Sequence, residues 1–297
     1  MTTTGWPWRA EASCLGCEQA LACNALNTCL DNPTDAARIE SVTRAVEFMR
    51  TRIGEPQRLS DIAQAALLSP FHFHRIFRHV TSTTPARFLT ALRMAEARHL
   101  LANSSLSVTE VCLSVGYSSL GTFISQFTKL AGLPPRRFRA ALSSFGDIRL
   151  CDLTETGAER HTAPGPLGAV TGGPENGGCA LLALYPGNAH DETPVTYGVM
   201  ETNRLTHTSP LADGAYQAVA LGFEKQTTLV DVVGSSRRPG DFVGAADSPI
   251  VVDGGRSRSS FHVALRRPRS IDPPLQLTSA LISLVRHQRQ QLAGTTR

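Results

Sequence analysis

The chain has 297 residues, of which 41% are hydrophobic and 18% are charged, and its formal net charge is +4. This length is sufficient for two independent hydrophobic cores. The sequence contains no charged stretch followed by an apolar one of the kind that directs secretion, and no apolar run approaches the length of a membrane span. We therefore expect a cytoplasmic protein that does not enter a membrane, in a reducing compartment where disulfides rarely persist.

Four of the seven cysteines lie close together near the start of the chain. Cys14, Cys17, Cys23 and Cys29 follow the spacing C-x2-C-x5-C-x5-C. Four thiolates can bind a zinc ion or an iron–sulfur cluster, and either would order a segment too small to fold alone. Residues 1–35 are therefore interpreted as a Cys-rich segment with three interpretations left open. It binds a metal or cluster, it carries four free thiols on a disordered tail, or it follows a start codon placed too far upstream and is not made.

A helix is expected to follow this segment, over residues 36–53. Its apolar residues step by three and four positions, which is the period of an amphipathic helix, and Gly54 and Pro56 end it. This helix is predicted to pack on the unit that comes next. The apolar positions are Ile39, Val42, Val46, Met49 and Ile53.

The most informative pattern is an echo at an offset of fifty residues. It preserves a serine that can cap a helix, two aromatic positions at helical spacing and a proline, which indicates duplicated supersecondary structure. In the first copy these residues include Ser69, Phe73, Phe77, Pro85, Arg87 and Phe88, and in the second Ser119, Phe123, Phe127, Pro135, Arg137 and Phe138.

Each copy is predicted to contain a short helix, a tight turn and a second helix, which is the helix-turn-helix pattern. In the first copy, Ser60 is predicted to cap a helix over residues 61–66. Ser69, followed by a proline, is predicted to begin a second helix that ends near His79.

The second copy carries the same kind of signals. Ser107 and Glu110 have the spacing of a capping box, and Gly116 stops the helix that they begin. A second helix is then expected from near Ser119 to Gly132.

Positive charge is concentrated in the region of these helices. Between residues 38 and 142 there are fourteen Lys and Arg residues against six Asp and Glu, whereas both flanking regions are net negative. A long helix that starts at Pro85 connects the two copies and would hold them at a fixed spacing. Arginine concentrated on helix-turn-helix units is typical of phosphate neutralisation on DNA. Residues 36–145 are therefore predicted to be an all-helical DNA-binding domain.

Longer motifs run through both copies of this unit. They are His72 to Arg78, Thr84 to Leu89, Arg93 to Ala97, Gly116 with Tyr117, and Leu133 to Arg139. Together these motifs resemble the AraC/XylS family of transcription regulators, over about a third of the chain. The resemblance implies a double helix-turn-helix domain whose two recognition helices enter successive major grooves, about 34 Å apart, on one face of double-stranded DNA. It also implies RNA polymerase as a partner and activation of transcription.

The resemblance also implies which residues of this chain bind DNA, because each DNA-binding position of the family can be assigned to one residue here. Arg75 is expected to contribute most to sequence discrimination, because a guanidinium can pair in a bidentate way with guanine N7 and O6. In the second helix the side chains are shorter than is common in the family, so this helix is expected to anchor mainly on phosphates. His72 is expected nearer the packed face. The DNA-binding residues are Phe71, His74, Arg75 and Arg78 in the first unit, and Gly121, Thr122, Ser125 and Lys129 in the second.

Two other functions stay open at this point. In one, the four N-terminal cysteines make the protein a redox- or metal-responsive regulator, since their x5 spacing resembles that of some cluster-binding bacterial regulators. In the other, one of these thiols accepts a methyl group from damaged DNA, as in Ada-type repair proteins, whose wider cysteine spacing this sequence does not match. An enzyme is not expected, because no G-x-S-x-G, H-E-x-x-H or Walker-type motif is present.

The composition changes to Gly, Pro, Thr and Ser in the second half, and residues 146–178 are predicted to be a linker. Beyond it, short β-like runs separated by turn signals predict a small antiparallel β-sandwich over residues 179–270. The stretch Asp213 to Ala220 resembles an edge of transthyretin-like or carboxypeptidase-regulatory-like sandwiches. The predicted strands cover residues 180–185, 195–201, 204–207, 216–223, 227–233, 241–244, 249–252 and 260–266.

The predicted fold class is therefore multi-domain α + β, with an all-α double helix-turn-helix domain followed by a small antiparallel β-sandwich domain. The sandwich is interpreted as a site for a small-molecule effector, a module for homodimer formation, or a structural module without a ligand. His190, His207 and His262 are isolated, which disfavours a metal-binding cupin. Residues 271–297 are predicted to form a C-terminal helix and tail, with the helix packed on the sandwich.

Overall fold

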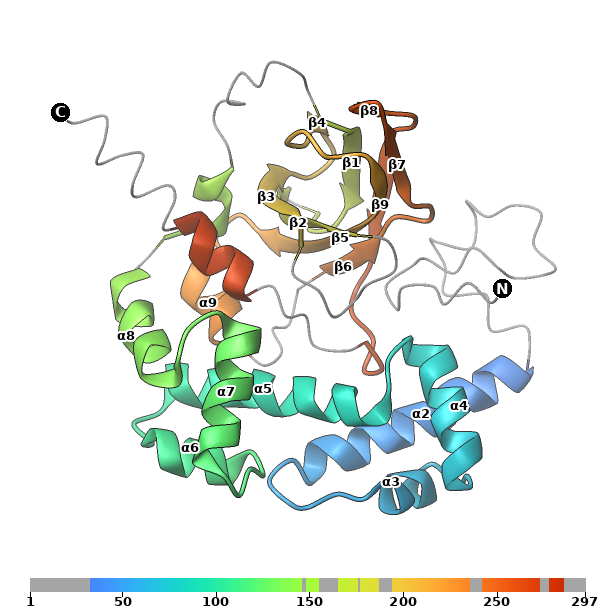
Figure 1. Ribbon diagram of the computed structural model, residues 1–297, viewed down its shortest axis with the longest axis vertical. Coiled ribbons are helices and arrows are strands. Elements are labelled where there is room, and N and C mark those ends of the chain that lie inside the picture. Colours follow the sequence, from blue (N-terminus) through green and yellow to red (C-terminus); the bar gives the residue numbers. More distant parts are fainter. Residues whose placement is uncertain are drawn as a thin grey trace.

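The computed structural model describes most of the chain as a helical part and a sheet part that pack against each other (Figure 1). The four N-terminal cysteines, Cys14, Cys17, Cys23 and Cys29, lie outside the described residues, as do the predicted linker residues 155–164. None of the described helices is both long and apolar enough to cross a membrane. The described residues are 33–145, 148–154, 165–175, 177–186, 194–235, 242–272 and 278–285.

Seven helices in chain order build the helical part of the described chain. The echo of fifty residues appears as two similar helix pairs, α3 with α4 and α6 with α7, joined by the long helix α5 (Figure 1). The bounds are α2 Pro33–Thr51, α3 Leu59–Ala65, α4 Pro70–Thr81, α5 Pro85–Asn103, α6 Val108–Ser114, α7 Leu120–Ala131 and α8 Pro135–Phe145. Helix α2 begins at Pro33, so the helical part starts three residues before the predicted boundary at residue 36.

The helix starts confirm one predicted capping box and correct another cap. Ser107 and Glu110 hydrogen bond reciprocally at the start of α6. The bond from the Ser107 backbone N–H to the Glu110 carboxylate, followed by that from the Ser107 side chain, holds the pKa of this carboxyl below its usual value. The prediction that Ser60 caps the first short helix is wrong. Helix α3 starts at Leu59, because the carboxylate of Asp61 accepts a hydrogen bond from the backbone N–H of the true N-cap, Arg58.

Each helix pair has its own aromatic centre. In the first unit, the Phe77 ring lies 5.3 Å from both Phe73 and Phe88, measured between ring centroids. In the second unit, Phe127 lies 5.8 Å from Phe123 and 5.3 Å from Phe138. These rings are buried. The pairs Phe77–Phe88 and Phe127–Phe138 are edge-to-face and the other two are tilted, and such aromatic pairs add to the stabilisation from burial. The predicted core positions of the echo are therefore confirmed in both copies.

The turns within the two units differ in one instructive residue. Gly116 has φ of +80° in the second unit, whereas the first unit has Leu67 with φ of +58°, a conformation that costs free energy for any residue with a Cβ. Leu67 is 77% exposed, so its side chain gains little from packing in return.

We therefore expect Leu67→Gly to raise the free energy of unfolding, by about 0.5–1 kcal/mol. Chemical denaturation of the full chain is the measurement. Gly116→Ala, which adds a Cβ in the corresponding turn of the second unit, is the control. Its Cβ would lie 2.8 Å from the carbonyl oxygen of Ile53, so this variant should lower the free energy of unfolding. A loss of stability in Leu67→Gly would contradict the assignment of strain to this turn.

The sheet part contains two sheets. One has the strand order β4-β1-β9, and the other has the order β3-β2-β5-β7-β8, with β6 also paired to β5. Most strand pairs are antiparallel, but β1 and β9 are parallel. The bounds are β1 Leu167–Gly172, β2 Gly178–Pro186, β3 Thr196–Glu201, β4 Leu205–His207, β5 Gly214–Glu224, β6 Phe242–Ala245, β7 Ile250–Asp253, β8 Arg256–Ser257 and β9 Phe261–Leu265.

Several predictions for this half need correction. The predicted linker of residues 146–178 contains the 3-10 helix η1 Leu150–Leu153 and all of β1, and the parallel pair β1–β9 means that the sheets are not purely antiparallel. The predicted strand 227–233 is instead the helix α9 Leu229–Val233, because Thr228 and Asp231 form a capping box. A separate sheet region is present, whereas the sandwich description itself is not confirmed.

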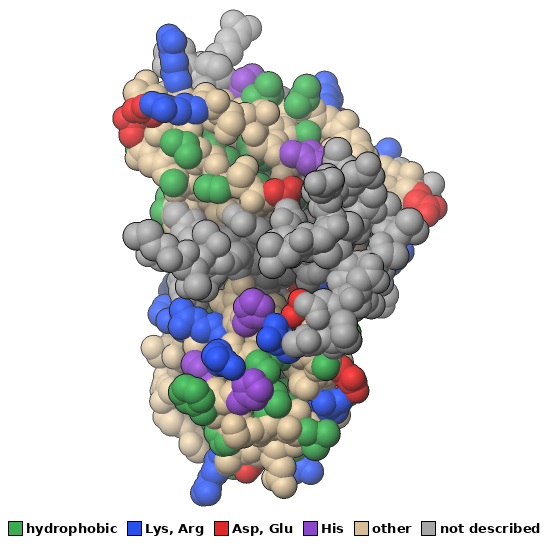
Figure 2. All heavy atoms as spheres, turned by 90° about the vertical axis from the view of Figure 1, so that its right-hand side faces the viewer, with side chains coloured by type: hydrophobic (Ala, Val, Ile, Leu, Met, Phe, Trp, Pro, Cys, Tyr) green, Lys and Arg blue, Asp and Glu red, His purple; other side chains and the backbone are tan. Residues whose placement is uncertain are grey.

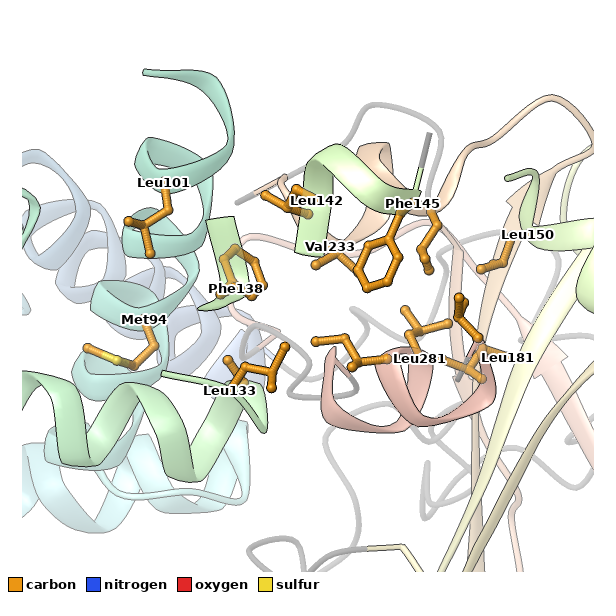
Figure 3. Packing of buried hydrophobic residues seen from close by; sticks show 14 of the residues in the cluster. Met94, Leu101, Leu133, Phe138, Leu142, Phe145, Leu150, Leu181, Val233 and Leu281 are labelled. Atoms are coloured by element: carbon orange, nitrogen blue, oxygen red, sulfur yellow. The ribbon is translucent and has the colours of Figure 1, made fainter. Parts of the chain in front are cut away.

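The second helix-turn-helix unit and the sheet part share one hydrophobic core. Side chains of α5 to α8 meet η1, α9, strand β2 and a helix over residues 278–285 in a single cluster of buried residues. Figure 3 shows Leu142 and Phe145 of α8 pointing toward Val233 of α9, with Leu281 beside them. The predicted C-terminal helix therefore packs on the helical part as well as on the sheets.

The first unit has a separate core, which the sheet part reaches at one point. Ile271, in the segment after β9, is buried among residues of α2 to α5. Two groups hold this segment: Asp272 accepts two hydrogen bonds from the Arg266 guanidinium, at 2.8 and 2.9 Å, and Arg50 donates to the carbonyl of Ser270 at 3.4 Å. We call residues 266–272 the strap, since they tie the sheet part to the first unit.

Candidate nucleic-acid interface

Helix α4 presents a basic and aromatic face to solvent. Phe71 is 84% exposed, and Arg75 and Arg78 are also exposed, because the opposite face of α4 is occupied by the buried rings of the first unit. Among the described residues, neither arginine forms an ion pair. Figure 2, which views the molecule from the side of α4, shows blue, purple and green side chains gathered over the helical part.

Two histidines of α4 lie differently from the prediction. His74 is half-buried rather than on the exposed face, and His72, expected nearer the packed face, is exposed. The repeat explains both positions. His74 corresponds to Ile124 of the second unit, which is also half-buried, and His72 corresponds to the exposed Thr122.

Helix α7 presents a more polar and less charged face. The predicted residues Gly121, Thr122, Ser125 and Lys129 are all exposed. The Thr122 backbone N–H donates to the hydroxyl of Ser119, the N-cap, which fixes the first turn of α7. Short hydroxyl side chains and one ammonium group suit contacts with phosphate oxygens, and they reach base edges less readily than an arginine does.

The exposed face also contains residues that sequence reasoning missed. Gln126 of α7 is exposed, and its amide group can form a bidentate pair with adenine. His79 is exposed in the last turn of α4, at the position that Lys129 occupies in α7. Arg87 and Arg137 are exposed in the first turns of α5 and α8. The echo itself carried the signal for His79, because it aligns His79 with a residue that was predicted to bind DNA.

The connecting helix sets the spacing of the two faces. Helix α5 has 19 residues, which gives a length of about 28 Å. The first unit packs at one end of α5 and the second at the other (Figure 1). This span is comparable with the distance of about 34 Å between successive major grooves of DNA. A stiff connector of this length can therefore present α4 and α7 to neighbouring grooves.

No metal site accompanies this surface within the part of the chain that the structure describes. There, no group of three or more His, Cys, Asp or Glu side chains is placed to hold a metal ion. The metal or cluster prediction concerned Cys14, Cys17, Cys23 and Cys29, which lie outside that part. It therefore stays a prediction.

Comparison with known proteins identifies the helical part. A family model described as "Helix-turn-helix domain" matches residues 62–141. The HTH-type transcriptional regulator ArgR of Pseudomonas aeruginosa is 34% identical over 98 residues, which are 33% of this chain and 30% of that protein. The HTH-type transcriptional activator RhaS of Escherichia fergusonii is 32% identical over 109 residues, 37% of this chain and 38% of that protein.

The chain carries an AraC-type DNA-binding domain. The predicted family resemblance is thereby confirmed. A solved AraC-type regulator structure from Chromobacterium violaceum is 32% identical and covers 35% of this chain and 94% of its own, with a TM-score of 0.34. This chain spans about a third of the length of the curated relatives it matches. The sheet part lies outside the matched AraC-type domain, and the likeness of residues 213–220 to transthyretin-like modules stays a prediction.

Proposed function

We propose that this chain is a sequence-specific transcription regulator that binds double-stranded DNA through the recognition helices α4 and α7. The observation that supports the proposal is a pair of exposed helix faces, on α4 and α7, that contain no Asp or Glu. Each helix belongs to its own packed unit, and the stiff helix α5 joins the two units. Arginines at one face supply base readout, and hydroxyl and ammonium groups at the other supply phosphate contacts.

DNA selection followed by footprinting tests this proposal. The full chain is incubated with a random DNA pool, and bound sequences are enriched and footprinted. We expect two protected half-sites on one face of the duplex, with centres about one helical turn, or 10 base pairs, apart. Binding without sequence preference, or a single protected groove, would contradict the use of both helices.

Arg75→Ala is expected to weaken binding to the selected site by about 1–3 kcal/mol and to relax the preference at one base pair. The physical reason is the loss of a bidentate pair with guanine. Fluorescence anisotropy on the selected site and on single-base variants of it measures both effects. Arg75→Lys is the matched control: it keeps the charge but loses the fork geometry, so it should retain non-specific binding and lose the base preference. An unchanged base preference in both variants would place the reading face elsewhere.

Lys129→Ala is expected to weaken binding evenly across sequences. The ammonium group of this exposed residue in the last turn of α7 is proposed to contact a phosphate, so its loss should lower the slope of log affinity against log salt by about 1. Titrations at several salt concentrations, on specific and random DNA, measure that slope. A change confined to the specific site would indicate a base contact instead.

Activation of transcription, contact with RNA polymerase and a homodimer are further parts of the proposal. The activator role is supported by the name of the relative RhaS, described as a transcriptional activator. Transcription in vitro from a promoter that carries the selected site tests it, since an activator raises transcript yield and a repressor lowers it. The redox- or metal-responsive alternative depends on the N-terminal cysteines and is tested by metal and sulfide content after anaerobic purification.

A further inference from the structure

A cavity opens between the edges of the two sheets. Strand β3 is the edge of the larger sheet, β4 is the edge of the smaller one, and a tight turn after Glu201 joins them. Because the two strands diverge into different sheets, the interior between the sheets is open on this side. The cavity has a volume of about 610 Å³ and is lined mainly by β3, β4 and residues 208–209.

The floor of the cavity is apolar. Leu182 and Leu184 of β2 and Met200 of β3 line it, and all three belong to the buried core between the sheets. Leu205 of β4 also lines the cavity and is 67% exposed. An apolar floor that continues into an exposed leucine favours an occupant with an apolar body.

Glycine at position 198 leaves space in this floor. Gly198 pairs with Leu182 across the sheet and lies two residues from Met200, so both Gly198 and Met200 face the interior. A Cβ added at Gly198 would meet nothing within 4 Å. The backbone there is ordinary strand, so any residue could occupy the position. The missing side chain, rather than a backbone requirement, keeps this part of the cavity open.

The rest of the cavity lining is polar, and its two charged side chains have opposite signs. The Arg204 guanidinium lies 2.9 Å from the Glu201 carboxylate, so the two charged side chains that line the cavity neutralise each other. Nδ1 of His207 lies 2.9 Å from the Gly165 carbonyl oxygen, which can only accept, so this nitrogen carries the proton. The other polar side chains of the lining residues carry hydroxyl groups, which donate and accept without charge, and those of Thr154 and Thr208 already donate to backbone carbonyls. They belong to Thr154, Thr196, Thr206, Thr208 and Ser209. Tyr197 also lines the cavity, but it lies on the side of β3 opposite Gly198 and Met200 and packs on the core shared with the helical part.

We propose that this cavity binds an uncharged small molecule with an apolar body and hydroxyl or carbonyl groups at one end. Its volume lies within the range of roughly 300–1,000 Å³ typical of small-molecule sites. The apolar floor receives the body, and the hydroxyl-rich lining receives the polar end. The balanced pair Glu201–Arg204 gives no net charge with which to attract an ion. This site does not depend on DNA binding by α4 and α7.

Two dyes with the same aromatic body test the class of ligand. N-phenyl-1-naphthylamine is uncharged, and 8-anilinonaphthalene-1-sulfonate adds a sulfonate to the same skeleton. Fluorescence titration of the full chain is expected to show saturable binding of the uncharged dye, about tenfold tighter than that of the sulfonated one. Equal or tighter binding of the sulfonated dye would overturn the assignment to uncharged ligands.

Gly198→Phe tests the position of the site. Its ring would occupy the space beside the floor and is expected to weaken binding of the uncharged dye about tenfold or more. Val251→Phe is the matched control, since it adds a similar ring at an exposed position of β7 that does not line the cavity, and should bind as the unmodified chain does. If Gly198→Phe does not fold, Leu205→Asp replaces it, because that exposed position tolerates a polar side chain. Unchanged dye affinity in a folded variant of either kind overturns the proposal.

Discussion

Phe138→Ala is expected to lower the free energy of unfolding by about 3–5 kcal/mol and to loosen the sheet part together with the second helix-turn-helix unit. Phe138 is completely buried and packs edge-to-face on Phe127. It belongs to the core that continues through α8 and the helix of residues 278–285 into strand β2. A cavity at this position removes contacts that serve both parts of the protein.

Phe88→Ala provides a matched comparison, because Phe88 is the counterpart of Phe138 in the echo. It is equally buried, and it packs on Phe77 in the separate core of the first unit. We expect a similar loss of stability, but one confined to α2 to α5 and the strap residue Ile271. Hydrogen exchange followed by mass spectrometry distinguishes the two: amides of β2 should exchange faster in Phe138→Ala and stay protected in Phe88→Ala. Equal protection of β2 in both variants would contradict a shared core.

Asp272→Ala is expected to cost about 2–4 kcal/mol of stability, since removing one partner of a buried ion pair leaves the other poorly solvated. The Asp272 side chain is 5% exposed and that of Arg266 is 20% exposed. The carboxylate also accepts a hydrogen bond from the backbone N–H of Arg269 at 2.7 Å, which closes the strap. Its loss should therefore free Ile271 from the core of the first unit.

The double variant Arg266→Leu with Asp272→Leu distinguishes the effect of an unpaired buried charge from the effect of losing the ion pair itself. It removes both charges together and should be more stable than Asp272→Ala, because no buried charge is left without its partner. Thermal unfolding of the unmodified chain and these two variants gives the ranking, and exchange at α2 reports on the docking of Ile271. A double variant that is the least stable of the three would mean that the strap depends on the ion pair itself.

The helices were predictable because their signals are local. The capping box of Ser107 and Glu110 and the terminating glycines mark helix ends within a few residues of sequence. Helix α8 was not predicted as a separate helix, although the echo aligns Pro135 with Pro85, which begins α5. The repeat therefore indicates this helix, which begins at Pro135.

The exposed face could be predicted to within a residue or two. Arg75, Thr122 and Lys129 lie where the family resemblance placed them, on the solvent side of α4 and α7. His74 lies half-buried because the helical period rotates it toward the core, as its counterpart Ile124 shows. Whether these residues contact DNA in the proposed manner is what the two substitutions above measure.

The sheet part was less predictable, because its order depends on contacts between distant segments. Strand β1 pairs with β9, about ninety residues further along, and nothing local in its sequence indicates that partner. Its glycines suggested a linker. In the structure, Gly168 lies directly against the ring of Phe261, where a Cβ would clash. A small residue is thus required by close packing there, which the composition alone cannot distinguish from chain flexibility.

The shared core also has a consequence for synthesis on the ribosome. Helices α6 to α8 emerge early, but residues 278–285, which belong to the same core as Phe138 and Leu142, are added about 140 residues later. At typical synthesis rates of about 5–20 residues per second, the shared core remains incomplete for roughly 7–28 seconds. The first unit, which closes almost entirely on itself, can fold during this interval. The second unit, although it has its own aromatic centre, completes its packing only when residues 278–285 have been added.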